Sequence, residues 1–128
     1  MNAEELKSRS KRMALDVITL VEKLPKSQTT DVIGKQLIRS ACSVAANYRA
    51  ACKARSRPDF INKLGVVEEE ADETLSWLEM LVDSGKSSSV DQESLMKEVK
   101  ELAAIFAASR ITARRNKTAM NRKLDHQS

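Results

Sequence analysis

The sequence predicts an all-α protein: an antiparallel up-down-up-down four-helix bundle over residues 1–115, followed by a short basic C-terminal tail at residues 116–128. Three observations support this fold class. Apolar residues recur at helical spacing in four segments, and no strand-like alternation competes with them. The chain has only three Gly and two Pro residues, and 3% of its residues are aromatic, which excludes a turn-rich β-sandwich. The connections are short, and short connections favour antiparallel neighbours.

The first two helices are separated by a proline. Apolar residues at steps of four, three and four mark the first helix, which we expect over residues 6–24, ending before Pro25. The second carries an apolar face of the same period and many alanines. We expect Thr29 or Thr30 to cap its start, and the helix to run to about Arg55.

The third and fourth helices follow from two start signals. Ser56 is expected to cap the third helix because a proline and an acid follow it in the first turn. The predicted core face of that helix consists of Phe60, Leu64, Val67, Ala71, Leu78 and Leu81. Ser89 and Gln92 fit a capping box that opens the fourth helix after a loop at residues 83–89. We expect this helix to end near Arg115, and the following tail to be flexible or disordered.

A polar seam is predicted between the second and third helices. Folding one back onto the other about Ser56 places Arg39 across from Glu73 and near Glu70. Asn47 is assigned to the same seam, as a hydrogen bond between helices. If the seam is buried, loss of one partner would cost about 3–5 kcal/mol, whereas an exposed seam would be worth less than about 1 kcal/mol.

Charge is unevenly distributed along the chain. The net charge is +4, but residues 57–83 carry −6 and the segments on both sides are basic. Opposite charges on neighbouring helices would explain this pattern, and so would a basic surface that contacts phosphate. In an up-down bundle, the start of the first helix and the end of the last helix lie at the same end of the molecule, so their basic residues are expected to form one patch. The candidate phosphate-binding residues are Lys7, Arg9, Lys11, Arg12, Arg110, Arg114, Arg115 and Lys117, with Arg122 and Lys123 beyond them.

Catalytic and metal-binding patterns are not found. A di-iron bundle needs Glu-x-x-His pairs, and the only histidine is His126 in the tail. Glu69, Glu70 and Glu73 are interpreted as a solvated or arginine-paired face. The same lack of a placed histidine argues against nucleophilic triads. We therefore expect a protein that is not an enzyme, with no cofactor and no metal.

Cysteine usage and hydropathy indicate the setting. Cys42 and Cys52 lie on one predicted helix, about 15 Å apart, which is too far for a disulfide. They are interpreted as small buried thiols, which suit a reducing cytoplasm. No apolar run approaches the length of a membrane span, and no hydrophobic segment follows the charged start to make a secretory signal. We expect a cytoplasmic protein that does not interact with membranes.

The segment from Gln36 to Leu81 resembles a known family. Its motifs are Gln36, Arg39-Ser40, Ala46-Asn47-Tyr48-Arg49, Ala54-Arg55-Ser56, Asp59-Phe60, Lys63-Leu64, Glu70-Ala71-Asp72-Glu73-Thr74 and Trp77-Leu78. In this order they resemble the bacterial four-helix bundle proteins first known from open reading frames in intervening sequences of 23S ribosomal RNA genes. One departure is Ala50, where the family pattern often has Glu.

The resemblance implies a left-handed bundle, homopentameric rings and no established catalytic activity. Related accessory proteins of diversity-generating retroelements form basic pentamers linked to nucleic acid, which supplies an analogy. The function expected from the sequence is therefore a non-enzymatic, oligomerising scaffold that binds RNA or DNA through basic chain ends. The alternative is a protein-interaction adaptor that does not bind nucleic acid and uses its small-residue faces and acidic third helix.

Overall fold

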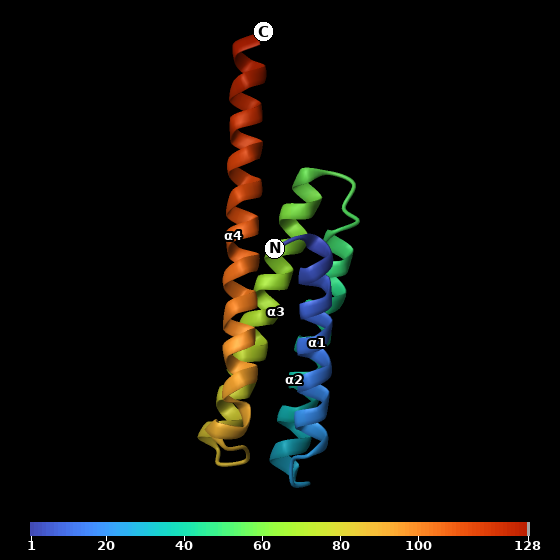
Figure 1. Cartoon of the computed structure of the whole chain (residues 1–128), viewed down its shortest axis with the longest axis vertical. Coiled ribbons are helices and arrows are strands. Elements are labelled where there is room, and N and C mark those ends of the chain that lie inside the picture. Colours follow the sequence, from blue (N-terminus) through green and yellow to red (C-terminus); the bar gives the residue numbers. More distant parts are fainter. Residues whose placement is uncertain (128) are drawn as a thin grey trace.

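The chain forms four long helices. A computed structural model describes the backbone of residues 1–127 and the side chains of residues 1–90 and 92–116. The helices are α1 (Ala3–Glu22), α2 (Gln28–Ala51), α3 (Arg57–Asp83) and α4 (Ser89–Gln127). Figure 1 shows them packed side by side, with consecutive helices running in opposite directions and α4 extending past the other three. The predicted up-down-up-down bundle is confirmed, and the described backbone contains no strand.

The ends of α2 differ from the prediction. Ser27 is the N-cap, and its side chain accepts a hydrogen bond from the backbone N–H of Thr30. The hydroxyl of Thr30 in turn accepts from the Ser27 N–H at 2.9 Å, so Thr30 closes a capping box instead of being the cap. The helix ends at Ala51, not near Arg55, which leaves a short connection before α3. Ser56 caps α3 as predicted.

The predicted capping box at the start of α4 is wrong. The amide nitrogen of Gln92 donates to the carbonyl of Leu78 on α3 at 2.8 Å, and its side-chain oxygen accepts no hydrogen bond from the described residues. The reason is that position 92 begins the core-facing stripe of α4, which continues through Val99 and Phe106. At its other end α4 continues to Gln127 instead of ending near Arg115, because no Gly or Pro interrupts it.

The predicted tail at residues 116–128 falls almost wholly on residues whose side chains lie outside the described part of the chain. Its flexibility stays a prediction. The tail residues Lys117, Arg122 and Lys123 are among those with undescribed side chains.

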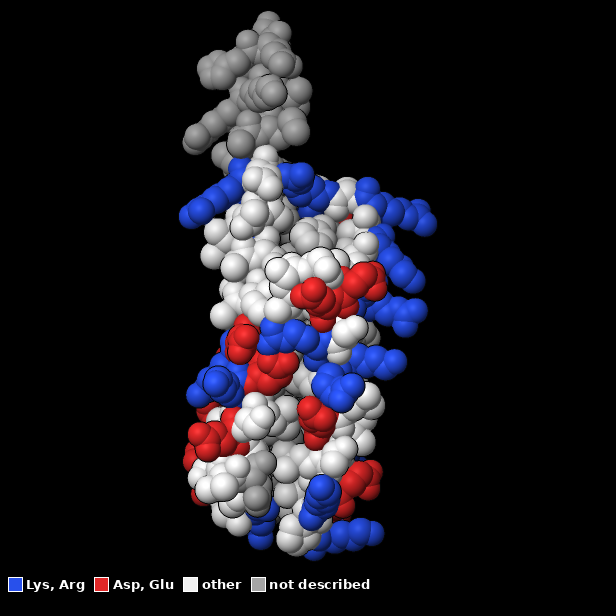
Figure 2. All heavy atoms as spheres, viewed as in Figure 1, with Lys and Arg blue, Asp and Glu red and all other residues white. Residues whose placement is uncertain are grey.

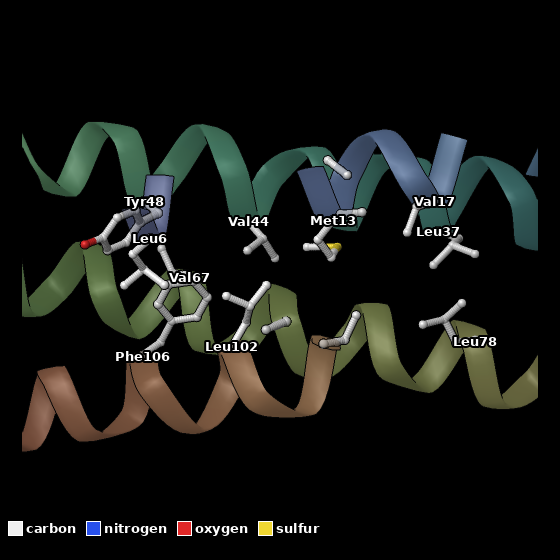
Figure 3. Close-up of a cluster of buried hydrophobic side chains, with 14 of the residues drawn as sticks. Leu6, Met13, Val17, Leu37, Val44, Tyr48, Val67, Leu78, Leu102 and Phe106 are labelled. Atoms are coloured by element: carbon white, nitrogen blue, oxygen red, sulfur yellow. The ribbon is translucent and has the colours of Figure 1, made fainter. Parts of the chain in front are cut away.

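A single apolar core runs along the bundle axis. Figure 3 shows Leu6, Tyr48 and Phe106 meeting at one end of this core. Most of the predicted α3 face is buried, but Phe60 is only half-buried and Ile61 takes a buried position beside it. The fully buried large side chains also include Met13, Val17, Leu37, Val44, Leu64, Val67, Leu78, Leu81, Val99 and Leu102.

The two cysteines are free thiols, as predicted from their spacing, but neither is fully buried. Cys42 is half-buried and Cys52 is exposed. The reason for the difference at Cys52 is that α2 ends one residue before it, so this residue lies in the connection instead of on a packed helical face.

The two glycines inside helices give a matched test of packing. A Cβ added at Gly65 would meet no atom within 4 Å, whereas one added at Gly34 would lie 2.9 Å from Cγ1 of Val21. We expect Gly65→Ala to raise the free energy of unfolding by about 0.5–1 kcal/mol through helix propensity. Gly34→Ala should give no gain, because the stiff Val21 side chain must move. Urea unfolding of both variants checks this, and equal stabilisation would contradict the packing of α1 on α2.

Candidate nucleic-acid interface

Exposed cations gather at one end of the bundle. The α2–α3 connection, the start of α1 and the part of α4 near residue 113 lie together there (Figure 1). We call the following exposed residues the basic end: Arg49, Lys53, Arg55, Arg57, Arg114 and Arg115. Carboxylates also lie near this end: Asp59 is two residues from Arg57, and Glu68 pairs with Arg110 one helical turn from Arg114. In the face drawn in Figure 2, blue side chains project around this end, and most of the red ones lie further down.

Part of the basic end opposes local helix electrostatics. A cation at the end of α2, such as Arg49, suits the negative end of the helix dipole. Arg57 is the first residue of α3, where the dipole favours anions instead. The acid of that first turn, Asp59, is engaged by Lys63 at 2.7 Å. The cation at Arg57 is therefore not explained by helix stability.

Two of the predicted phosphate-binding arginines bridge neighbouring helices. Arg9 on α1 donates from Nε to Glu98 on α4 at 3.1 Å and also pairs with Glu101 at 3.3 Å. The hydrogen bond to Glu98 raises the pKa of the Arg9 guanidinium. Arg110 on α4 pairs in the same way with Glu68 on α3, which raises the pKa of Arg110. Each pair links two helices and is about a quarter exposed.

The remaining predicted cations form two groups. Lys7 pairs with Glu4 within α1 at 2.6 Å, and Lys11 and Arg12 are exposed one turn further along. Glu98, the partner of Arg9, lies about 24 Å along the α4 axis from Arg114. Lys7 and Lys11, however, line a groove between α1 and α2 together with Arg49 of the basic end. The α1 cations thus adjoin the basic end at Arg49 on α2, and a patch shared by both chain ends stays a prediction.

The α2–α3 connection and the first residue of α3 supply the cations that sequence analysis missed. Lys53, Arg55 and Arg57 are exposed beside the α4 group. Residues 28–56 carry a net charge of +4, the highest of any segment, so the signal was present in the sequence. The fold is needed to interpret this positive charge, because only the fold brings the connection to the same end of the bundle as the start of α1.

A cleft of about 920 Å³ opens at the basic end, between α4, the start of α1 and the α2–α3 connection. Tyr48, Phe60 and Ile105 form apolar walls, and Ser109, Thr112 and Asn116 line it along α4. The ring of Tyr48 packs 5.3 Å from that of Phe106, centroid to centroid. Burial, followed by contact with Cys52, raises the pKa of the Tyr48 hydroxyl, which therefore stays neutral.

The predicted seam between α2 and α3 is confirmed for its ionic part. Arg39 pairs with Glu73 and lies 3.3 Å from Glu70. The Arg39 side chain is 47% exposed, so the seam is the exposed version, which contributes little to stability.

The buried polar contact between α2 and α3 is a different one. The hydroxyls of Thr74 and Ser40 lie 2.9 Å apart, and both residues are fully buried. The assignment of Asn47 to the seam is wrong: its amide donates to the carbonyl of Ser43 at 2.9 Å within α2, because that acceptor lies one turn back on the same helix.

Metal ligands do not cluster in the described part of the chain. No group of three or more His, Cys, Asp or Glu side chains there could hold a metal ion. Glu70 and Glu73 are instead turned to Arg39.

Helices capable of crossing a membrane are also absent from the residues described: none is long and apolar enough.

Two comparisons with known proteins agree. The sequence model of the 23S rRNA-intervening sequence protein family matches residues 4–108. A crystal structure from Bacteroides thetaiotaomicron VPI-5482, of a protein with unknown function from the S23 ribosomal protein family, is 34% identical, with a TM-score of 0.79. The match covers 86% of this chain and 98% of that one. No curated protein matches the chain.

The seam gives a pH prediction with an intrinsic probe. Hydrogen bonds from Arg39 and then Trp77 lower the pKa of Glu73, and Trp77 is the only tryptophan of the chain. The ionised seam is therefore kept as pH falls through the ordinary glutamate range near about 4.3, and lost below it. We expect the Trp77 fluorescence titration to have a midpoint below that range in the native protein and a higher one in Arg39→Ala. Glu73→Gln should abolish the transition, and an unchanged midpoint in Arg39→Ala would contradict the pairing.

Proposed function

The chain belongs to the 23S rRNA-intervening sequence protein family, and we propose that it is a non-enzymatic, oligomerising helical scaffold that binds RNA or DNA phosphates through its basic end. The observation that carries this proposal is the gathering of exposed cations at the basic end from α2, the α2–α3 connection and α4. Arg57 is there against the helix dipole, so stability alone does not account for the set.

Phosphate binding fits the geometry and charge of this end. Lys and Arg side chains that neutralise phosphates release counterions, and such binding is sequence-independent and weakens with salt. Lys11 and Arg12 on α1 extend the positive surface down the side of the bundle. Arg9 and Arg110 are assigned to holding the helices, since carboxylates already engage both.

Self-association is the second part of the proposal. A groove of about 500 Å³ runs between α1 and α2. Its apolar lining is Leu15, Ile18, Cys42, Ala45 and Ala46, and the charged residues Glu4, Lys7, Lys11 and Arg49 line it as well. Leu15 is 48% exposed. The small α2 residues allow another helix to approach closely, and a second copy of the chain is the proposed occupant. The family resemblance implies a pentamer, in which the basic ends would combine into one large positive surface.

A protein-interaction adaptor is the alternative function. The outer face of α3 carries exposed acids, among them Glu69, Asp72, Glu79 and Asp83. This face would suit a basic protein partner and would not bind nucleic acid. For either function we place the protein in a reducing cytoplasm, which suits an exposed free thiol at Cys52.

The phosphate proposal predicts salt-sensitive binding that depends on position as well as on charge. Labelled structured RNA and duplex DNA should bind in fluorescence anisotropy at about 50 mM salt and weaken linearly in log affinity against log salt. The variant Lys53→Gln/Arg55→Gln/Arg57→Gln should bind less tightly, and its salt slope should be smaller by about 0.7–0.9 for each phosphate that the variant no longer neutralises.

The matched control removes the same charge from the opposite end of the bundle, as Lys23→Gln/Lys26→Gln/Lys35→Gln. It should bind almost as the native protein does. Equal decreases in affinity for both triple variants would show that only net charge matters. No binding by the native protein at low salt would leave the adaptor as the function.

The self-association proposal predicts a mass change from one apolar side chain. Leu15→Glu should lower the mass measured by sedimentation equilibrium, because it places a charge in the α1–α2 groove. Met80→Glu is the control, since Met80 is 47% exposed on α3, away from the groove. A native protein that sediments as a monomer, or equal effects of both variants, would contradict the proposed surface.

A further inference from the structure

The cleft at the basic end is larger and more apolar than phosphate contacts require. Its volume of about 920 Å³ lies within the range of small-ligand pockets, which is about 300–1,000 Å³. A surface that only neutralises phosphates needs exposed cations and no cavity. We propose that this cleft accepts an unpaired nucleobase, so that the protein prefers single-stranded nucleic acid to duplex; this inference rests on the proposed function.

The walls of the cleft suit the two faces and the edge of a base. Phe60 is half-buried where a well-packed core position was predicted, and it lines the cleft beside Ile105. Aromatic side chains of this kind are platforms on which bases stack. Along α4, Ser109, Thr112 and Asn116 follow one another at steps of three and four, and their hydroxyl and amide groups line the cleft where a base edge would need donors and acceptors.

The cations around the cleft favour a nucleotide, which carries phosphate, over an uncharged ligand. Arg57 lines it directly, and Lys53 and Arg55 flank cleft residues along the chain. Arg115 is exposed between two further lining residues, Ala113 and Asn116. A nucleotide placed with its base inside would thus have its phosphates among cations. In a duplex the bases are paired and stacked inside the helix and could not enter the cleft, so a duplex would contact only the cations around the cleft, through its phosphates.

A base-binding cleft also accounts for the small side chain at Ala108. Ala108 is exposed, lines the cleft and lies one helical turn from Thr112. Ala104, one turn earlier on α4, is also exposed but is not among the residues that line the cleft. These two alanines make a matched pair, because Leu at either position adds the same volume and no charge.

The test compares a labelled 12-nucleotide single-stranded RNA with a blunt 12-base-pair duplex in fluorescence anisotropy at fixed salt. The native protein should bind the single strand more tightly. Phe60→Leu should weaken single-strand binding about tenfold, within the usual range for loss of one stacking platform, and leave duplex binding unchanged. Ala108→Leu should do the same by narrowing the cleft, and Ala104→Leu should have no effect.

A second readout detects stacking itself. The fluorescence of 2-aminopurine placed in the single strand should be quenched on binding to the native protein and to Ala104→Leu, but less in Phe60→Leu. Thermal melting followed by circular dichroism checks that each variant is folded. Ala108→Leu tests the cleft without replacing a buried side chain, because Ala108 is exposed.

The outcomes separate this inference from the function on which it rests. Salt-sensitive binding with equal affinity for both probes, unchanged in Phe60→Leu and Ala108→Leu, would overturn the base-binding cleft and leave the phosphate scaffold intact. Binding of oleate or an acidic helical peptide that is blocked by Ala108→Leu, without single-strand preference, would overturn it too. Absence of binding to both nucleic acids at about 50 mM salt would overturn the proposed function itself.

Discussion

The packing of α2 against α3 is the contact on which the rest of the structure depends. Both helices are apolar or small along this contact, and the hydroxyl pair of Ser40 and Thr74 is buried within it. Such a polar pair is stable in the core only when each group has a partner, so it favours one register of α2 on α3 over neighbouring ones. With that register set, the connection at residues 52–56 lies at one fixed end of the bundle, and its cations are displayed there.

Ion pairs add to the apolar packing that attaches the outer helices α1 and α4. α1 packs mainly on α2 and meets α4 only over a limited stretch. Arg9 bridges that stretch to Glu98, and Arg110 makes the equivalent bridge between α4 and α3. Arginine suits this role because its planar guanidinium binds a carboxylate through two hydrogen bonds. Among the described residues, the cations that join helices are thus distinct from the exposed cations to which phosphate binding is assigned in the proposal.

The fold could be predicted from the sequence because helical periodicity acts locally, whereas of the predicted helix caps only Ser56 was correct. The register that pairs Arg39 with Glu73 was also predictable, since a short connection fixes which residues face each other. The bridges of Arg9 and Arg110 were not, because they join residues whose alignment depends on how α4 packs on α1 and α3. Asn47 and Gln92 were misassigned for a related reason: an amide side chain has several acceptors within reach, and packing selects among them. The cleft could not be predicted at all, since it is formed by three separate parts of the chain.

Two residues whose positions are not those that helix stability favours, Arg57 and Phe60, therefore bear on function. Arg57 begins a helix at the end that favours anions, Phe60 is half-buried although Ile61 beside it packs fully, and both line the same cleft. Each departure costs little, so neither would indicate a site by itself. Together they place a cation and an aromatic ring at one opening, at the end of the molecule where the exposed positive charge is concentrated. A chain selected only for a stable bundle would have reason to place an acid at position 57 and to bury the ring. Binding of an anion with an aromatic group accounts for both choices at once.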